Sequence, residues 1–112
     1  MKELKWIGSS KGDLMQFPND VIKEMGYALF VAQNGGTYEK TKPFKGYGSG
    51  VYEVAIRYNK DAYRTIYFIE SGDKIYVIHC FQKKSKTGIK TPREEIVVID
   101  KRLKWLKLGR HT

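Results

Sequence analysis

Apolar and polar residues alternate along three consecutive stretches in the second half of the chain. This alternation predicts β-strands at residues 51–58, 62–70 and 74–81. The turns between them, Asn59-Lys60-Asp61 and Ser71-Gly72-Asp73, are short and consist mostly of turn-forming residues. Because turns of this length join antiparallel neighbours, we expect the three strands to form an antiparallel meander.

The first of these strands predicts two chemically different faces for the sheet. One face would carry Tyr52, Val54 and Ile56, and the opposite face would carry Glu53, Ala55 and Arg57. The apolar face is expected to pack on helices, and the Glu53/Arg57 face is expected to look into a groove.

Helical spacing dominates both ends of the chain. After a short strand at Leu4–Ile7, we expect a short helix that Ser10 caps and that runs through Gln16. A longer helix should follow, which Pro18 opens and Asn34-Gly35-Gly36 ends. Core positions of the longer helix recur every three or four residues, at Val21, Met25, Ala28, Leu29 and Ala32. The capping-box pattern Thr91-Pro92-Arg93-Glu94 starts a C-terminal helix with Ile96, Ile99, Leu103 and Leu106 on one stripe.

These elements predict an α+β fold in a single domain that spans residues 1–112. We expect a small antiparallel β-sheet packed by two N-terminal helices and a C-terminal helix, with the helices on one face. Residues 37–50 are expected to form a flexible approach to the meander. Their Gly46-x-Gly48-x-Gly50 pattern is not a phosphate-binding P-loop, because it leads into a strand and lacks the Lys-Ser/Thr that such a loop needs.

Charge is spread unevenly along the chain. The net charge is +9, and residues 82–112 hold ten Lys/Arg against three Asp/Glu. The loop between the last predicted strand and the C-terminal helix holds Lys83, Lys84, Lys86 and Lys90. Such clustering favours an anionic partner, either nucleic acid or an acidic protein, and a merely soluble basic surface is the alternative.

The sequence lacks the common signatures of metal and nucleophile chemistry. It has no HExxH, no paired His/Cys ligand spacing and no nucleophile elbow, so we expect neither a metal nor a cofactor. Cys80, the one cysteine, lies in an apolar strand and is expected to be a buried structural thiol. The first residues lack the apolar core of a signal peptide and no apolar run suits a membrane span, so we expect a cytoplasmic protein with no membrane partner.

The residue types that remain for catalysis are Arg, Lys, Tyr, Glu and one strand-borne histidine, His79. They suffice for metal-free cleavage of RNA by its own 2′-hydroxyl. That reaction needs a group to accept the hydroxyl proton, cations to stabilise the charged phosphorane, and a proton for the leaving 5′-oxygen.

Several motifs together resemble one family. They are Tyr63-Arg64-Thr65-Ile66-Tyr67, His79-Cys80-Phe81-Gln82-Lys83-Lys84 and Lys90-Thr91-Pro92, with Trp6-Ile7-Gly8-Ser9-Ser10 near the N-terminus. Over nearly its whole length the chain resembles the phage-related, HigB-type branch of the RelE/ParE toxins. The resemblance implies a RelE-like fold and the toxin of a type II toxin–antitoxin module. It further implies a ribosome-dependent mRNA endoribonuclease that inhibits translation and is neutralised by a small helix-turn-helix antitoxin.

The resemblance also implies roles for individual residues. Arg64 matches the arginine beside the scissile phosphate, and Lys83 and Lys84 match the basic pair after the last strand. Glu53 and Ala55 stand where the best-known RelE relatives have lysines, so the general base stays open between Glu53 and His79. The candidate catalytic residues are therefore Arg64, Lys84, Glu53 and His79. The candidate RNA-binding residues are Arg57, Lys83, Lys86, Lys90 and Arg93.

Structural alternatives stay open beside these roles. Arg64 could simply pair with Glu53 across neighbouring strands, the loop lysines could be solvated charges, and His79 could be a hydrogen-bonded core residue. Two other functions also stay open for the whole protein. One is a ParE-like inhibitor of DNA gyrase that acts by protein contact, and the other is a non-catalytic nucleic-acid-binding phage accessory protein.

Overall fold

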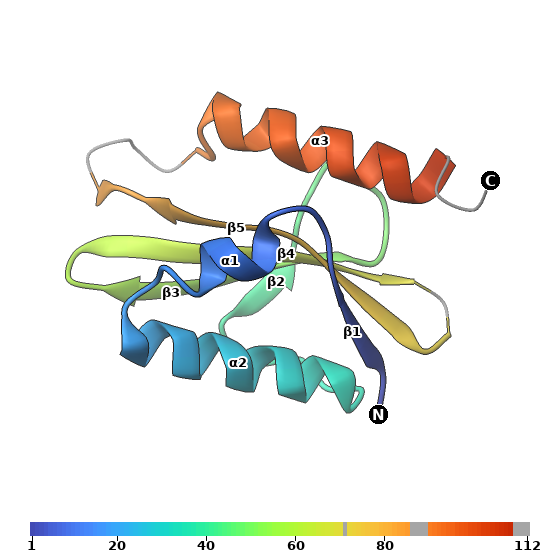
Figure 1. Ribbon diagram of the computed structural model, residues 1–112, viewed down its shortest axis with the longest axis horizontal. Helices are drawn as coiled ribbons and strands as arrows, with labels where there is room; N and C mark the ends of the chain where they lie inside the picture. The colour runs from blue at the N-terminus through green and yellow to red at the C-terminus, as the bar shows by residue number, and fades with distance from the viewer. Residues whose placement is uncertain (71, 86–89, 109–112) are drawn as a thin grey trace.

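The computed structural model describes residues 1–70, 72–85 and 90–108. Within these residues the chain forms one five-stranded sheet with three helices (Figure 1). The elements in chain order are β1 (Glu3–Trp6), α1 (Ser10–Leu14), α2 (Asn19–Gln33), β2 (Thr41–Pro43), β3 (Val51–Tyr58), β4 (Asp61–Glu70), β5 (Lys74–Lys83) and α3 (Arg93–Leu108). The α+β class predicted from the sequence is confirmed.

The sheet has the strand order β1-β5-β4-β3-β2. The predicted antiparallel meander of β3, β4 and β5 is present, and the short strand β2 continues it antiparallel to β3. At the other edge, β1 runs parallel to β5, so the sheet is mixed rather than purely antiparallel. β2 was not expected. Its Pro43 is tolerated because an edge strand has a neighbour on one side only, so not every residue needs a backbone N–H for the sheet.

The helices cover both faces of the sheet, and the expectation that they share one face is wrong. Figure 1 shows α2 on one side of the sheet and α3 on the other. Val54 and Val77 pack with α1 and α2 in one core, whereas Ile66 and Ile78 pack with α3 in a second core. The run Ile75-Tyr76-Val77-Ile78 is apolar at every position, as a strand covered on both faces requires.

The positions predicted to face the core of α2 are all buried, from Val21 to Ala32. The N-terminus of α1 differs from the prediction, since Ser9 and not Ser10 flanks the helix. Ser10 is buried, and its hydroxyl donates to the carbonyl oxygen of Val77 at 3.1 Å. That bond ties α1 to β5. None of the helices within the described residues is long and apolar enough to cross a membrane.

A β-bulge in β5 breaks the regular alternation of its side chains. On β4, Ile66 lies opposite His79 while the next residue, Tyr67, lies opposite Val77, so Ile78 is the extra residue. Both Ile78 and His79 consequently direct their side chains towards α3, and Val77 lies on the α2 side. The face of His79 could not be predicted from strict alternation.

A basic groove and a cation cluster beside α3

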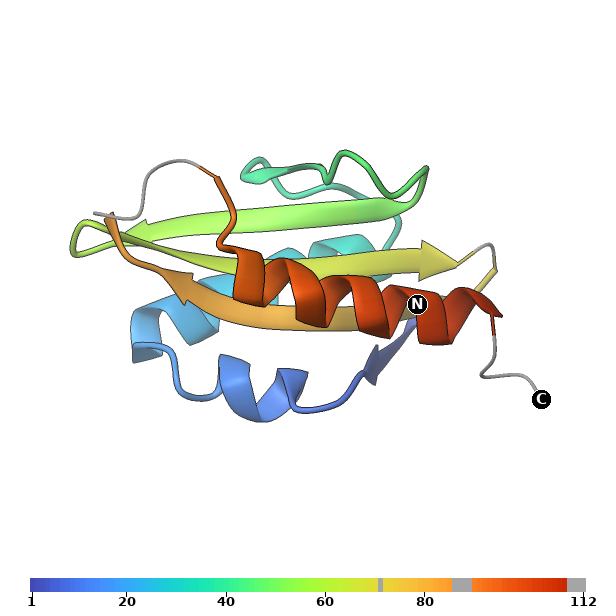
Figure 2. The same cartoon turned by 90° about the horizontal axis from the view of Figure 1, so that it is seen from above.

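A groove of about 950 Å³ separates α3 from the chain between β2 and β3. The groove exists because α3 runs along β5 and leaves this face of β3 without a covering helix (Figure 2). Glu53 and Arg64 line the groove from the central strands. Its other lining residues are Lys42, Pro43, Phe44, Lys45, Gly46 and Tyr47 from β2 and the following loop, and Lys90, Thr91, Ile96 and Asp100 from the start of α3 and the residues before it.

Glu53 and Arg64 form a buried ion pair. Arg64 lies opposite Ala55 on β3, and its Nη1 donates diagonally to Oε2 of Glu53 at 2.6 Å. The Glu53 side chain is only 4% exposed and that of Arg64 only 16%. Lys42 also lies near this carboxylate, with its Nζ 4.0 Å from Oε1. The small side chain of Ala55 leaves room for the diagonal contact.

One donor of Arg64 is left over in this arrangement. Its Nε is buried and has no hydrogen-bond partner among the described residues. A buried donor without a partner is costly, and because this Nε is covered, an oxyanion would contact the guanidinium where the side chain, 16% exposed, lines the groove. Arg64 is therefore held by the Glu53 carboxylate and presents the exposed part of its side chain to both hollows.

A second, smaller hollow of about 220 Å³ adjoins the first at Arg64, which lines both. It collects Arg57, Lys60, Ala62, Lys83, Lys84 and Ser85. Arg57, Ala62 and Lys83 lie in one row across β3, β4 and β5, so the small alanine leaves a depression between two cations. Burial lowers the pKa of the Lys83 ammonium, and the positive charges of Arg64 and Arg57 lower it further against the opposing field of Glu53. Lys83 is only 5% exposed.

Asp61 fixes the end of β5 beside this cluster. Its carboxylate accepts a hydrogen bond from the backbone N–H of Ser85 at 3.0 Å and another from the side chain of Gln82 at 2.7 Å. The hydrogen bond from Ser85, followed by that from Gln82, lowers the pKa of Asp61. The first residue of β4 thereby holds Gln82 and Ser85, the residues on either side of Lys83 and Lys84.

His79 lies apart from both hollows. Its Nε2 is 2.7 Å from Oε1 of Glu95 on α3, and its Nδ1 is 3.4 Å from Nη1 of Arg102. The ring is nearly buried and stacks on Phe81. These contacts make His79 a link between β5 and α3, and its catalytic role stays a prediction. Cys80 is buried as expected, and burial raises the pKa of its thiol to about 12.

The other predicted residues are distributed around this region. Lys84 lines the small hollow and Lys90 the large groove, whereas Arg93 is exposed at the start of α3 and lines neither. Lys86 lies outside the described residues. Sequence reasoning missed Lys42, Lys45 and the aromatic residues near them, although a basic, aromatic and glycine-containing loop was a visible signal. Among the described residues, no group of three or more His, Cys, Asp or Glu could hold a metal ion.

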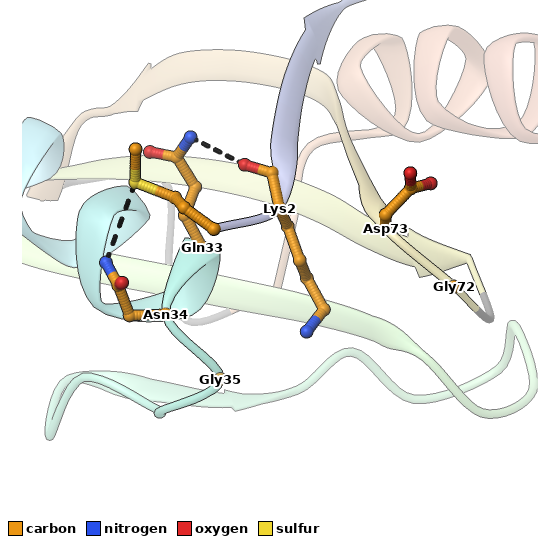
Figure 3. A pocket seen from close by; sticks show the side chains of 7 residues that line it. Lys2, Gln33, Asn34, Gly35, Gly72 and Asp73 are labelled. Atoms are coloured by element: carbon orange, nitrogen blue, oxygen red, sulfur yellow. Dashed lines mark hydrogen bonds between the residues drawn. The ribbon is translucent and has the colours of Figure 1, made fainter.

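A further hollow of about 380 Å³ lies at the other end of the sheet, lined by Lys2, Gln33, Asn34, Gly72 and Asp73 among others. Figure 3 shows the side chain of Gln33 directed at the backbone carbonyl of Lys2. Gln33 donates to the carbonyl oxygen of Lys2 at 2.9 Å, and Asn34 contacts the sulfur of Met1 at 3.8 Å. These contacts fasten the N-terminus to α2, and none of the predicted site residues lies there.

Fold and site together define a small basic α+β protein with an arginine-centred groove. The chain belongs to the family described as "Phage derived protein Gp49-like (DUF891)", whose model matches residues 12–104. This membership supports a toxin of the RelE superfamily as the class of protein, and the HigB-type branch stays a prediction.

Among solved structures, a chain of the toxin–antitoxin complex RelBE2 from Mycobacterium tuberculosis is 14% identical with a TM-score of 0.49. The alignment covers 73% of this chain and 98% of that chain. No conclusion about function follows from a likeness at this level. No curated protein sequence matches the chain significantly.

Proposed function

We propose that this protein is the toxin of a type II toxin–antitoxin module and that it inhibits translation by cutting mRNA on the ribosome. The observation that carries the proposal is Arg64, a largely buried arginine that Glu53 holds at the junction of two cation-lined hollows. A rigidly held guanidinium beside further cations suits a phosphate whose charge increases during reaction. Membership of the Gp49-like family supports the same function.

Cleavage would proceed by attack of the 2′-hydroxyl on the neighbouring phosphorus. A base takes the hydroxyl proton, the P–O5′ bond breaks, and the 5′-oxygen receives a proton, which gives a 2′,3′-cyclic phosphate and a free 5′-hydroxyl. Arg64 would bind the phosphate and stabilise the phosphorane, and Lys84 would add positive charge nearby.

Proton transfer falls best to Lys83 in this scheme. Its lowered pKa increases the fraction of neutral amine near neutral pH, and it shares a hollow with Arg64. The carboxylate of Glu53 is already bound to Arg64, so holding the guanidinium in place suits Glu53 better than acting as the general base. His79 is separated from both hollows, and its ring is bound between Glu95 and Arg102.

The partners follow from the same proposal. The cation-lined groove and the smaller hollow beside it would bind mRNA and ribosomal RNA. A helix-turn-helix antitoxin would neutralise the toxin by covering these two basic surfaces or by binding beside them. Action in the cytoplasm would follow, because translating ribosomes are there.

The test is induced expression in bacteria, with mapping of RNA 5′ ends across translated messages. Wild type should arrest growth and produce new 5′-hydroxyl ends at a fixed place in codons. Arg64→Ala and Lys83→Met should abolish both effects, and Lys84→Ala should weaken them. Lys23→Ala is the matched control, because Lys23 is an exposed lysine on α2 at the opposite face of the sheet.

Other outcomes would replace the proposal. Arrest with intact messages and damaged or over-wound DNA would identify a gyrase inhibitor. Folded wild-type protein that causes no arrest and makes no cuts would favour a non-catalytic nucleic-acid-binding protein.

A further inference from the structure

One wall of the groove is aromatic, and it has no part in the cleavage reaction proposed above. Phe44 and Tyr47 both line the groove, and their rings stack with centroids 5.2 Å apart and an interplanar angle of 9°. Both rings are only partly buried. The residues lie in the glycine-containing stretch that separates β2 from β3.

Three hydrogen bonds hold this wall in place. The Tyr47 hydroxyl donates to Oδ1 of Asp100 at 2.5 Å, and Nζ of Lys107 donates to the carbonyl oxygen of Tyr47 at 2.9 Å. The backbone N–H of Phe44 donates to the carbonyl oxygen of Val51 at 2.9 Å. Burial and the bond to Asp100 raise the pKa of Tyr47 to about 12, so its phenol stays protonated and keeps donating. The stacked pair is thus preorganised between β3 and α3.

Both rings line the groove, but Phe44 does not also line the hollow beside the C-terminal half of α3. Tyr47 does line that separate hollow, which has a volume of about 470 Å³. In this stack, Tyr47 lies between the groove and the hollow beside α3, and Phe44 faces the groove that Arg64 and Glu53 also line.

The charges around this ring match a polyanion. Lys42, Lys45 and Lys90 are exposed along the groove, and Arg64 lies on its floor. The groove's two acidic residues are already bound, Glu53 to Arg64 and Asp100 to Tyr47. Cations that follow a backbone, combined with an aromatic platform for bases, are the features by which proteins bind single-stranded nucleic acid.

We propose that the groove is a nucleotide-binding subsite in which the base next to the phosphate on Arg64 stacks on the ring of Phe44. This subsite extends the proposed ribonuclease function and rests on it for the identity of the RNA. Stacking accepts every base because each has a π-face, so the subsite contributes affinity and position more than sequence preference.

The experiment measures binding of 2′-O-methyl RNA octamers, which lack the attacking hydroxyl and stay intact. Fluorescence anisotropy compares wild type, Phe44→Leu and the control Phe30→Leu, which alters an exposed ring on α2. Leucine keeps the apolar volume and removes the aromatic face, and urea unfolding verifies that each variant is folded. A second octamer carries the same backbone with abasic sites.

The expected result is a loss of roughly 5- to 150-fold in affinity of Phe44→Leu for the intact octamer, the range for one lost base–aromatic stack. The abasic octamer should bind wild type and Phe44→Leu equally, and Phe30→Leu should match wild type throughout. No loss for Phe44→Leu, an equal loss with both octamers, or wild type that binds neither would overturn the subsite. Unchanged RNA binding with weakened binding of poly-glutamate would instead assign the wall to an acidic protein segment.

The subsite and the ribonuclease proposal can fail separately. Arg64-dependent cleavage in cells that Phe44→Leu leaves unchanged would refute the subsite alone. RNA binding that depends on Phe44, in a wild-type protein that cuts no message, would refute the ribonuclease alone.

Discussion

Arg64→Ala tests the centre of the site, but it also removes half of a buried ion pair. The Glu53 carboxylate, 4% exposed, would lose its hydrogen-bonded cation and keep Lys42 at 4.0 Å and the charge of Lys83. Removing one partner of such a pair costs about 3–5 kcal/mol, a large part of the ~5–15 kcal/mol that stabilises a typical domain. At about 4 °C per kcal/mol for a chain of this size, the melting temperature should fall by roughly 12–20 °C. Loss of toxicity in this variant alone would therefore not establish a phosphate-binding role.

The double variant Glu53→Leu/Arg64→Met separates stability from activity. Replacing both charges with apolar side chains of similar size removes the uncompensated carboxylate, so stability should return to within about 2 kcal/mol of wild type or exceed it. Cleavage should stay absent, because nothing replaces the guanidinium. Urea unfolding followed by circular dichroism gives the stabilities, and mapped RNA 5′ ends give the activity.

Arg57→Ala provides the matched control, since Arg57 is an exposed arginine of the same cluster. Its effect on unfolding should stay within about 0.5 kcal/mol. A stable, folded double variant that still cuts RNA would refute the role of Arg64. An Arg64→Ala variant as stable as wild type would refute the energetic argument about the ion pair.

Three further predictions follow from individual groups. Burial lowers the pKa of Lys83 in the folded protein below its ordinary value of 10.5. Between the folded and the unfolded pKa the unfolded state binds more protons, so the free energy of unfolding rises with pH in that range. Lys83→Met should flatten this rise in urea unfolding measured between pH 7 and 10, and parallel curves for variant and wild type would contradict the prediction. With a pKa of about 12, only about one Cys80 thiol in ten thousand is ionised at pH 8. Ellman's reagent should therefore react slowly with the native protein and fast with the protein unfolded in guanidinium. A fast reaction with the native protein would show that the thiol is accessible. Asp61→Ala should weaken RNA binding roughly 2- to 10-fold by releasing Ser85 and Gln82, and Asp73→Ala at the opposite end of β4 should leave binding unchanged. Stronger RNA binding by Asp61→Ala would instead mean that Asp61 acts by its charge, because its removal leaves the cluster more positive.

Local patterns predicted much of the architecture because the forces that set them are local. β3 and the core positions of α2 agree with the structure, since alternation and helical spacing report directly which side chains are buried. Arg64, Lys83 and Lys84 were selected from a resemblance, and the structure brings them to one hollow. The single-domain organisation stays a prediction.

Other features depend on contacts between distant parts of the chain. The direction of β1 follows from its pairing with β5, about seventy residues later, and four residues of strand carry no signal for it. The location of α3 on the face opposite α2 depends on β5 being apolar on both sides. The bulge at Ile78 turned His79 towards Glu95, and no periodicity rule predicts where a strand will gain an extra residue.

The sequence by itself determined the class of fold, the excess of positive charge and the residue types available for chemistry, because composition and short-range periodicity specify these. Only the tertiary structure decided that Arg64 pairs with Glu53, that Lys83 is buried beside two arginines, and that Phe44 joins the same groove. Those facts depend on strand register and on which face each helix covers, and both arise from packing between elements far apart in the chain.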